Sequence, residues 1–252
     1  MLIPFTDLAQ RHAIAVERVI HAGAHLGEEA PAYRAVGANE VLWIEGNPDL
    51  IKRVTENVAP YGHTVVQALL GAESGNEVTF HVTNFDSMSS SILEFGTHSS
   101  AHSEVVVVGD QRHVLRTLDE VAEANGFIEA DFLNLDLQGY ELEALRGAER
   151  LLQHIRTIYT EVNVDEVYKD CVLLPELDAW LNARGFEAAE VQLYGCARRD
   201  CSDGGQPDAG GQRFFGWGDC CYLRVETPRP FASIHPKDAA DWFLPTSWES
   251  GT

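Results

Sequence analysis

The sequence predicts a single α/β domain in which a mostly parallel sheet is covered by helices on both faces. Two observations favour this class. Residues 19–70 alternate short apolar runs with turns and helical segments, and the 252-residue chain, 45% hydrophobic and 23% charged, can bury the core of one domain. We therefore expect one domain over residues 1–252, with its core at about 19–225 and an extended tail at 226–252.

The first part of the chain supplies three predicted strands. Residues 1–16 favour a short amphipathic helix capped by Thr6. Buried-strand-like runs then follow at residues 19–21, 40–45 and 64–70. Because these runs are separated by a glycine turn and by helical segments, they predict parallel neighbours in a doubly wound sheet.

The middle of the chain breaks this alternation. Residues 78–82 alternate apolar and polar side chains, as in a half-exposed strand, and residues 105–108 form another short strand-like run. The segment between them, 84–103, is rich in serine and histidine. We therefore expect a β-hairpin-like insertion that carries a mobile loop. A capping box at Thr117–Glu120 then starts a helix that ends at Gly126.

The second half of the chain returns to core elements. A helix with Leu142 and Leu145 on one face separates two strands, and another helix runs from Pro175 to a cap at Gly185. The strands expected here lie at residues 131–137, 155–162, 187–194 and 220–225. The last two are joined by residues 195–219, a long glycine-rich link that is typical of either a functional lid or a disordered segment.

Charge narrows the classes of partner. Eighteen Lys and Arg against 39 Asp and Glu give a formal charge of −21. This balance argues against nucleic acid and against anionic membrane surfaces, because affinity for both depends on basic side chains. A neutral or cationic small molecule is the easier partner, although the acidity can also serve solubility alone. The chain shows no secretion signal and no apolar run that would span a bilayer, so a cytoplasmic location is expected.

Five cysteines are present, and their spacing matches neither a C-x-x-C pair nor a zinc site. Reduced thiols are the expectation for a cytosolic protein. Cys196 and Cys201 fall in the same link and could pair under oxidising conditions.

A glycine turn and an acidic residue form the first candidate site. Gly23 and Gly27 follow the first strand, where a ligand can approach the backbone closely near the start of a helix. The spacing is not that of the dinucleotide fingerprint, and an ordinary strand-to-helix turn would look the same. Glu45 lies 45 − 23 = 22 residues later, at the end of the second strand, where a carboxylate can accept hydrogen bonds from both ribose hydroxyls of an adenosine. NAD and S-adenosylmethionine both carry this ribose.

A second candidate site follows the fourth core strand. Asp136, Gln138 and Glu141 cluster where this strand meets its helix. The corresponding edge of an open parallel sheet faces the ligand crevice. Asp136 follows apolar strand residues, which favours a functional placement. Gln138 and Glu141 have an alternative role, since acidic and polar groups stabilise the positive end of a helix.

With these blocks in view, the chain resembles the FkbM-type methyltransferases. The resemblance rests on the glycine turn with Glu45, on residues 136–148, and on residues 160–163. It covers about residues 19–225 and implies a Rossmann-like class I methyltransferase fold with a mostly parallel seven-stranded sheet. It also implies S-adenosylmethionine as cofactor and a hydroxyl of a sugar or natural product as methyl acceptor.

The resemblance also implies which residues hold the cofactor. Carried over by position, these are His21, Gly23, His25, Gly27, Glu45, Asn84 and Ser90; Asp136 and Gln138 of the second candidate site are further candidates for cofactor binding. Glu45 falls at the ribose, and Asn84 with the run Ser89–Ser91 falls beside the site. The chain departs from the family at His21, which replaces the usual acid that contacts the cofactor's amino group, and at residues 196–211, which have no counterpart.

A hydroxyl acceptor must lose its proton, so a general base helps, and the candidates are Asp136, Glu161 and a histidine of the His98–His102 loop. Asp136 could instead hold the cofactor. Asp136, Glu161 and Asp219 could also gather a divalent cation, although three acids far apart in sequence favour this only weakly.

Two other classes of function stay open at this stage. An NAD-dependent oxidoreductase could share the fold, and a non-catalytic cofactor-binding or scaffold protein would fit the departure at His21. We expect the link 195–219 and the serine run to frame the pocket for a small-molecule acceptor. The identity of the acceptor and the choice between monomer and homodimer are left open.

Overall fold

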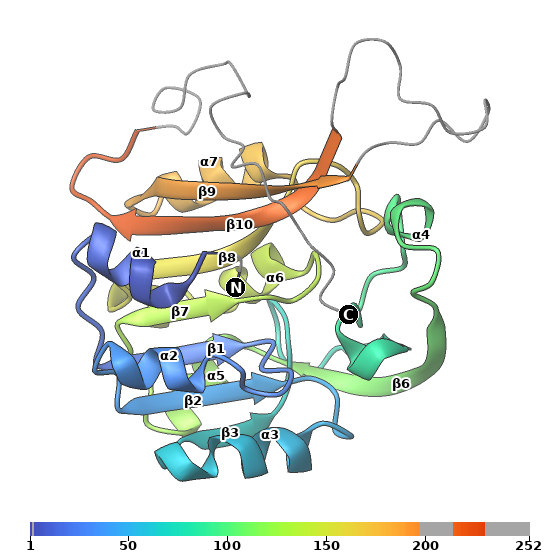
Figure 1. Cartoon of the computed structure of the whole chain (residues 1–252), viewed down its shortest axis with the longest axis horizontal. Coiled ribbons are helices and arrows are strands. Elements are labelled where there is room, and N and C mark those ends of the chain that lie inside the picture. The colour runs from blue at the N-terminus through green and yellow to red at the C-terminus, as the bar shows by residue number, and fades with distance from the viewer. Residues whose placement is uncertain (2, 197–213, 230–252) are drawn as a thin grey trace, which may run out of the picture.

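The central feature of the computed structural model is a seven-stranded sheet between two layers of helices (Figure 1). The structure describes residues 1, 3–196 and 214–229. The strand order is β3-β2-β1-β7-β8-β10-β9, in which β10 alone runs antiparallel to its neighbours. The strands are β1 (Arg18–Ala22), β2 (Glu40–Glu45), β3 (Thr64–Gln67), β7 (Phe132–Leu135), β8 (Thr157–Asn163), β9 (Phe186–Cys196) and β10 (Phe214–Arg224). The predicted class, including the mostly parallel seven-stranded sheet, is confirmed.

Helices cover both faces because successive strand residues are apolar on both sides. Val19 of β1 packs into one core cluster and Ile20 into the other. The first cluster is covered by α1 (Phe5–Arg11), α2 (Ala30–Ala35) and α3 (Ile51–Val58). The second is covered by α5 (Leu118–Ala124), α6 (Glu141–Arg146) and α7 (Leu174–Asn182). Strands that are buried on both faces are typical of parallel sheets.

A second sheet extends from the end of the first. It contains β4 (Leu69–Leu70), β6 (Val107–Arg116) and β5 (Glu77–Thr83), in that order. β5 and β6 pair antiparallel, which confirms the hairpin-like insertion. The connecting residues carry the short helices η2 (Phe85–Ser87) and α4 (His98–Ala101). In Figure 1 the arrowheads of β1, β2 and β7 point toward the side where β6 and α4 lie, so the insertion stands beside the carboxyl ends of the parallel strands.

Several sequence expectations about boundaries are wrong. The third strand, expected at 64–70, splits at Ala68, because Leu69 and Leu70 pair with β6 and leave the main sheet. The strand expected at 105–108 begins at Val107 and runs to Arg116. The link expected at 195–219 is partly strand, because β9 reaches Cys196 and β10 starts at Phe214. The remainder of that link, 197–213, and the tail from 230 lie outside the described residues, as does Cys201, which could pair with Cys196 under oxidising conditions.

The two predicted helix caps have different outcomes. Thr6 caps nothing, because α1 begins at Phe5 and Pro4 occupies the cap position. Thr117 does cap α5, where its hydroxyl accepts a hydrogen bond from the Glu120 N–H at 3.3 Å. The Glu120 carboxylate reaches the Thr117 N–H through the Ser74 hydroxyl, which accepts from that N–H and donates to the carboxylate at 2.5 Å. Among the helices of residues 1, 3–196 and 214–229, none has the length and apolar character needed to cross a membrane.

Candidate functional site

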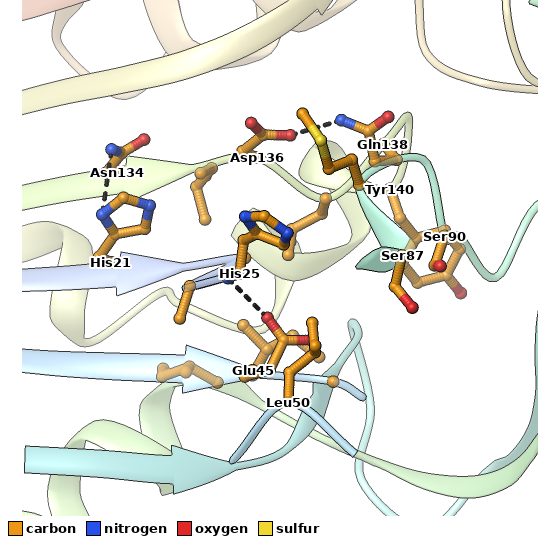
Figure 2. Close-up of a pocket in the computed structure, with 18 of the residues that line it drawn as sticks. His21, His25, Glu45, Leu50, Ser87, Ser90, Asn134, Asp136, Gln138 and Tyr140 are labelled. Carbon is orange, nitrogen blue, oxygen red and sulfur yellow. Dashed lines mark hydrogen bonds between the residues drawn. The ribbon is translucent and has the colours of Figure 1, made fainter. Parts of the chain in front are cut away.

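A cavity of about 330 Å³ opens at the carboxyl ends of β1, β2 and β7 (Figure 2). Its volume lies within the range of sites that bind small molecules. The loops that follow these three strands form its floor, and residues of the insertion, among them Ser87, Met88 and Ser90, line another wall. In an open α/β sheet this edge is the usual place for a ligand.

The glycine turn lets two strand ends meet at the floor of the cavity. Gly23 has φ +87°, and a Cβ added there would overlap the Asp136 carbonyl oxygen. Gly27 has φ +74°, and a Cβ there would lie 2.6 Å from Val58 Cγ1. Both positions therefore require glycine for conformation and for space. The turn also donates the N–H groups of Gly23 and Ala24 to the Ile44 carbonyl, which joins it to the end of β2.

Glu45 lines the same cavity from the last position of β2. It is 7% exposed, and its Oε2 accepts from the His25 N–H at 2.8 Å while its Oε1 accepts from the Asn47 N–H at 2.7 Å. Burial raises the pKa of the Glu45 carboxyl, and these N–H groups oppose that shift. A carboxylate has about four acceptor positions, so two N–H donors leave capacity for ligand hydroxyls.

His21 is buried in an aromatic cluster. Its ring stacks on Trp43 with centroids 4.6 Å apart, and its Nδ1 lies 3.0 Å from the Tyr33 hydroxyl. Asn134 on β7 contacts the same nitrogen at 3.4 Å (Figure 2). Burial lowers the pKa of His21, so the ring is neutral near pH 7. The side chain therefore supplies a packed neutral wall and no charge for a ligand.

His25 lies across the turn with φ +45°. Its Nδ1 is 2.7 Å from Glu28 Oε1, and this hydrogen bond raises the pKa of His25. Its backbone N–H donates to Glu45, so its conformation is tied to the candidate ribose acid. The structure thus brings His21, Gly23, His25 and Glu45 to one cavity.

A hydrogen-bonded acidic group follows β7. Gln138, with φ +54°, donates from Nε2 to Asp136 Oδ1 at 2.6 Å and to Glu161 Oε2 at 2.7 Å. Its Oε1 accepts from the Tyr168 hydroxyl at 2.5 Å. Burial, together with the charges of Asp136 and Glu141, raises the pKa of Glu161 well above its ordinary value. Asp136 lines the cavity, whereas Glu161 is buried and is not among the lining residues. Gln138 connects these two predicted catalytic carboxyls through its two hydrogen bonds.

Glu141 has a structural role at the start of α6. Its Oε1 accepts from the Leu137 N–H at 2.8 Å and from the Gly139 N–H at 3.2 Å. Its Oε2 is buried without a hydrogen-bond partner in the described part of the chain. Burial raises the pKa of Glu141 to about 7. This arrangement favours the helix-start alternative for Glu141 that the sequence left open.

This shift makes stability depend on pH. Because the pKa of Glu141 rises from 4.5 to about 7 on folding, its stabilising contribution is complete below pH 4.5 and is lost as the pH rises through 7. Between pH 4.5 and 8, we expect the free energy of unfolding of the wild-type protein to fall by up to about 3 kcal/mol relative to that of Glu141→Gln, measured by urea unfolding. Glu143→Gln, on the same helix but 41% exposed, is the control and should run parallel to wild type. Parallel curves for both variants would contradict the prediction.

The remaining predicted residues divide between the cavity and other places. Ser90 is buried and lines the cavity, and its neighbour Ser91 donates to the Gln138 carbonyl at 2.8 Å. Asn84 is not brought to the cavity lining, because its carboxamide binds the backbone of Val106 and Glu104 inside the insertion.

His98, the buried histidine of the expected loop, also lies away from the cavity lining. Its ring stacks on Phe95 with centroids 4.4 Å apart, and burial lowers its pKa to about 4. No group of three or more His, Cys, Asp or Glu side chains in the described ranges is arranged to hold a metal ion. Asp219 instead accepts a hydrogen bond from the Tyr159 hydroxyl.

Sequence reasoning missed several residues of the site. Glu29, Asn134 and Tyr159 line the cavity, and Tyr168 holds Gln138. Asn134 had a usable signal, since it lies two positions before Asp136 on the same strand and interrupts an apolar run. Glu29 and Tyr168 had no comparable signal, because they reach the site only through tertiary packing.

Comparisons with known proteins agree on one chemistry. A family model described as "Methyltransferase FkbM domain" matches residues 21–188. The 2-O-methyltransferase NoeI of Sinorhizobium fredii is 25% identical over 158 residues, which cover 60% of this chain and 65% of that protein. The hexuronic acid methyltransferase AglP of Haloferax volcanii is 27% identical over 135 residues, which cover 53% of this chain and 52% of that protein. The chain thus spans less than two thirds of either relative.

Solved structures that match most of the chain share little sequence with it. Magnesium protoporphyrin IX methyltransferase (ChlM) from Synechocystis PCC 6803, solved with bound SAH, is 11% identical with a TM-score of 0.46, and the match covers 87% of this chain and 80% of that one.

Proposed function

The chain belongs to the FkbM methyltransferase family, and from this premise we propose that it transfers a methyl group from S-adenosylmethionine to a hydroxyl of a sugar or sugar-like small molecule. The observation that carries the proposal is the cavity, in which Glu45 on β2 and Asp136 on β7 flank the open glycine turn of β1. The names of the two relatives, a 2-O-methyltransferase and a hexuronic acid methyltransferase, support a sugar hydroxyl as acceptor.

The residues present suit such a cofactor. Glu45 has free acceptor capacity for ribose hydroxyls, and Gly23 lines the same cavity without a side chain. Apolar side chains at the ends of β3 and β4, Ala68, Leu69 and Leu70, line the cavity next to Glu45 and suit the adenine ring. When bound, the cofactor's sulfonium supplies an activated methyl group, and the protein mainly aligns donor and acceptor.

The chain's own part in the chemistry falls to the acids at the end of β7. An acceptor hydroxyl must lose its proton, and Asp136 faces the cavity as an acceptor for it. Gln138 holds the Asp136 carboxylate in place through its 2.6 Å hydrogen bond. Burial and the neighbouring charges of Asp136 and Glu141 raise the pKa of Glu161 well above its ordinary value, which favours the neutral form of this buried carboxyl.

Calorimetric titration with S-adenosylmethionine and with NAD tests the cofactor, because both contain the ribose that Glu45 is proposed to bind. We expect binding of the first alone. Transfer of labelled methyl groups to a panel of neutral sugars and hexuronic acids then tests the acceptor. Binding of NAD with no binding of S-adenosylmethionine would overturn the proposal, and cofactor binding without methyl transfer to any acceptor would favour a non-catalytic protein.

Replacement of Glu45 should weaken cofactor binding. Glu45→Ala is expected to cost about 1–3 kcal/mol of binding free energy for S-adenosylhomocysteine, the range for lost hydrogen bonds to a charged group. Glu40→Ala is the matched control, since Glu40 lies at the exposed opposite end of the same strand and pairs with Arg18. Equal affinities for the two variants in calorimetry would remove Glu45 from the ribose site.

A further inference from the structure

One part of the cavity, around the Met1 amino group, is acidic. Glu29, Asp136 and Asp219 all line it, although they come from α2, from the end of β7 and from β10. The adjoining strand residue, His21, is neutral because burial lowers its pKa. The negative charge here therefore comes from Glu29, Asp136 and Asp219, and β1 contributes none.

An ammonium group already lies in this part of the cavity. The Met1 amino group is 3.3 Å from Glu29 Oε1. Burial disfavours its charge, but the fields of Glu29, Asp219 and Asp136 raise its pKa overall. The acidic part of the cavity thus stabilises an alkylammonium ion, with Glu29 as the direct contact.

Apart from the Met1 amino group, Glu29 has no side-chain partner in the described part of the chain. It occupies the N-cap position of α2, yet its side chain caps no backbone N–H of that helix. Its side chain is 20% exposed, and within the described part of the chain its hydrogen bond goes to Met1. The Glu29 carboxylate thus stabilises no helix end and no side chain, and a ligand ammonium group can take the place of the Met1 amino group beside it.

We propose that the Glu29 carboxylate binds the α-ammonium group of the methionine part of S-adenosylmethionine. The inference rests on the proposed function, because it requires that this cofactor occupies the cavity. β1 carries the neutral His21 and therefore provides no negative charge for the ammonium group. The proposal places that charge on Glu29, which follows the glycine turn. With the ribose on Glu45, the amino-acid part would extend past Gly23 toward Glu29, since all three line one cavity.

Binding of two probes that differ only in the amino-acid part tests this assignment. S-adenosylhomocysteine carries the α-ammonium group, and 5′-methylthioadenosine keeps the adenosine and sulfur but lacks that group. Dissociation constants are measured by calorimetry for wild type, Glu29→Gln, Glu29→Asp and the control Glu56→Gln. Glu56 is a 65% exposed glutamate of α3, so its variant removes the same charge away from the cavity.

We expect Glu29→Gln to weaken S-adenosylhomocysteine binding by about tenfold or more, the effect of losing a charged hydrogen bond, and to leave 5′-methylthioadenosine binding unchanged. Glu29→Asp should recover part of the loss, and Glu56→Gln should match wild type with both probes. Equal affinity of wild type and Glu29→Gln for S-adenosylhomocysteine, or an equal loss for both probes, would overturn the role of Glu29 alone. Wild-type protein that binds neither probe would instead overturn the proposed function.

Discussion

Alanine at position 23 is expected to destabilise the protein by about 2–6 kcal/mol and to weaken cofactor binding with it. Two costs add at this position. A left-handed φ of +87° costs a side-chain-bearing residue about 1–3 kcal/mol, and the added Cβ would overlap the Asp136 carbonyl oxygen, with a further overpacking cost of about 1–3 kcal/mol. The overlap pushes β7 away from β1 at the floor of the cavity, so stability and binding should fall together.

Gly37→Ala separates the two costs. Gly37 has φ +94°, and a Cβ there would meet nothing within 4 Å, so its variant carries the conformational cost alone. Urea unfolding of both variants gives the comparison, and Gly23→Ala should lose clearly more stability. S-adenosylhomocysteine affinity should stay normal in Gly37→Ala. An equal loss in the two variants would show that the approach of Gly23 to Asp136 imposes no steric limit.

The sheet could be predicted from the sequence because its evidence is local. The apolar run at residues 40–45 has the same bounds as β2, and the run at 155–162 corresponds to β8 with small errors at its ends. The split of the third strand could not be predicted in this way. Leu69 and Leu70 are as apolar as a continuing strand, and only their pairing with Leu115 and Arg116, far along the chain, turns them into the second sheet.

The candidate site was predictable where position along the chain decides the role. Glu45 and Asp136 directly follow or end core strands, so topology alone places them at the ligand edge. Glu29 depends on the path of the chain after the turn, and Tyr168 reaches Gln138 from a segment 30 residues away. Asn84 shows the opposite error, because its amide serves the backbone of its own loop. Tertiary packing determines contacts of this kind, and the periodicity of apolar residues in the sequence does not reveal it.

Replacement of Asp136 should have the largest effect on activity. Asp136→Asn is close to isosteric, and its Oδ1 can still accept the Gln138 hydrogen bond, so the local geometry is kept while the basic carboxylate is lost. If Asp136 takes the acceptor's proton, turnover should fall by about 100-fold or more with cofactor affinity nearly unchanged, since general-base catalysis contributes about that factor. Rates of methyl transfer and the dissociation constant of S-adenosylhomocysteine are measured together.

The same pair of measurements separates the other roles of Asp136. A cofactor ligand would show its loss first in the dissociation constant, and a metal ligand would make activity respond to added Mg²⁺ or to a chelator. Glu161→Gln is the companion variant, because its Oε1 can still accept from Gln138 Nε2 and the raised pKa of Glu161 favours a neutral side chain at this position. It should therefore lose much less activity than Asp136→Asn. Full activity with normal affinity in Asp136→Asn would show that Asp136 has no part in the site, and the proton would then have to leave the acceptor through another group lining the cavity.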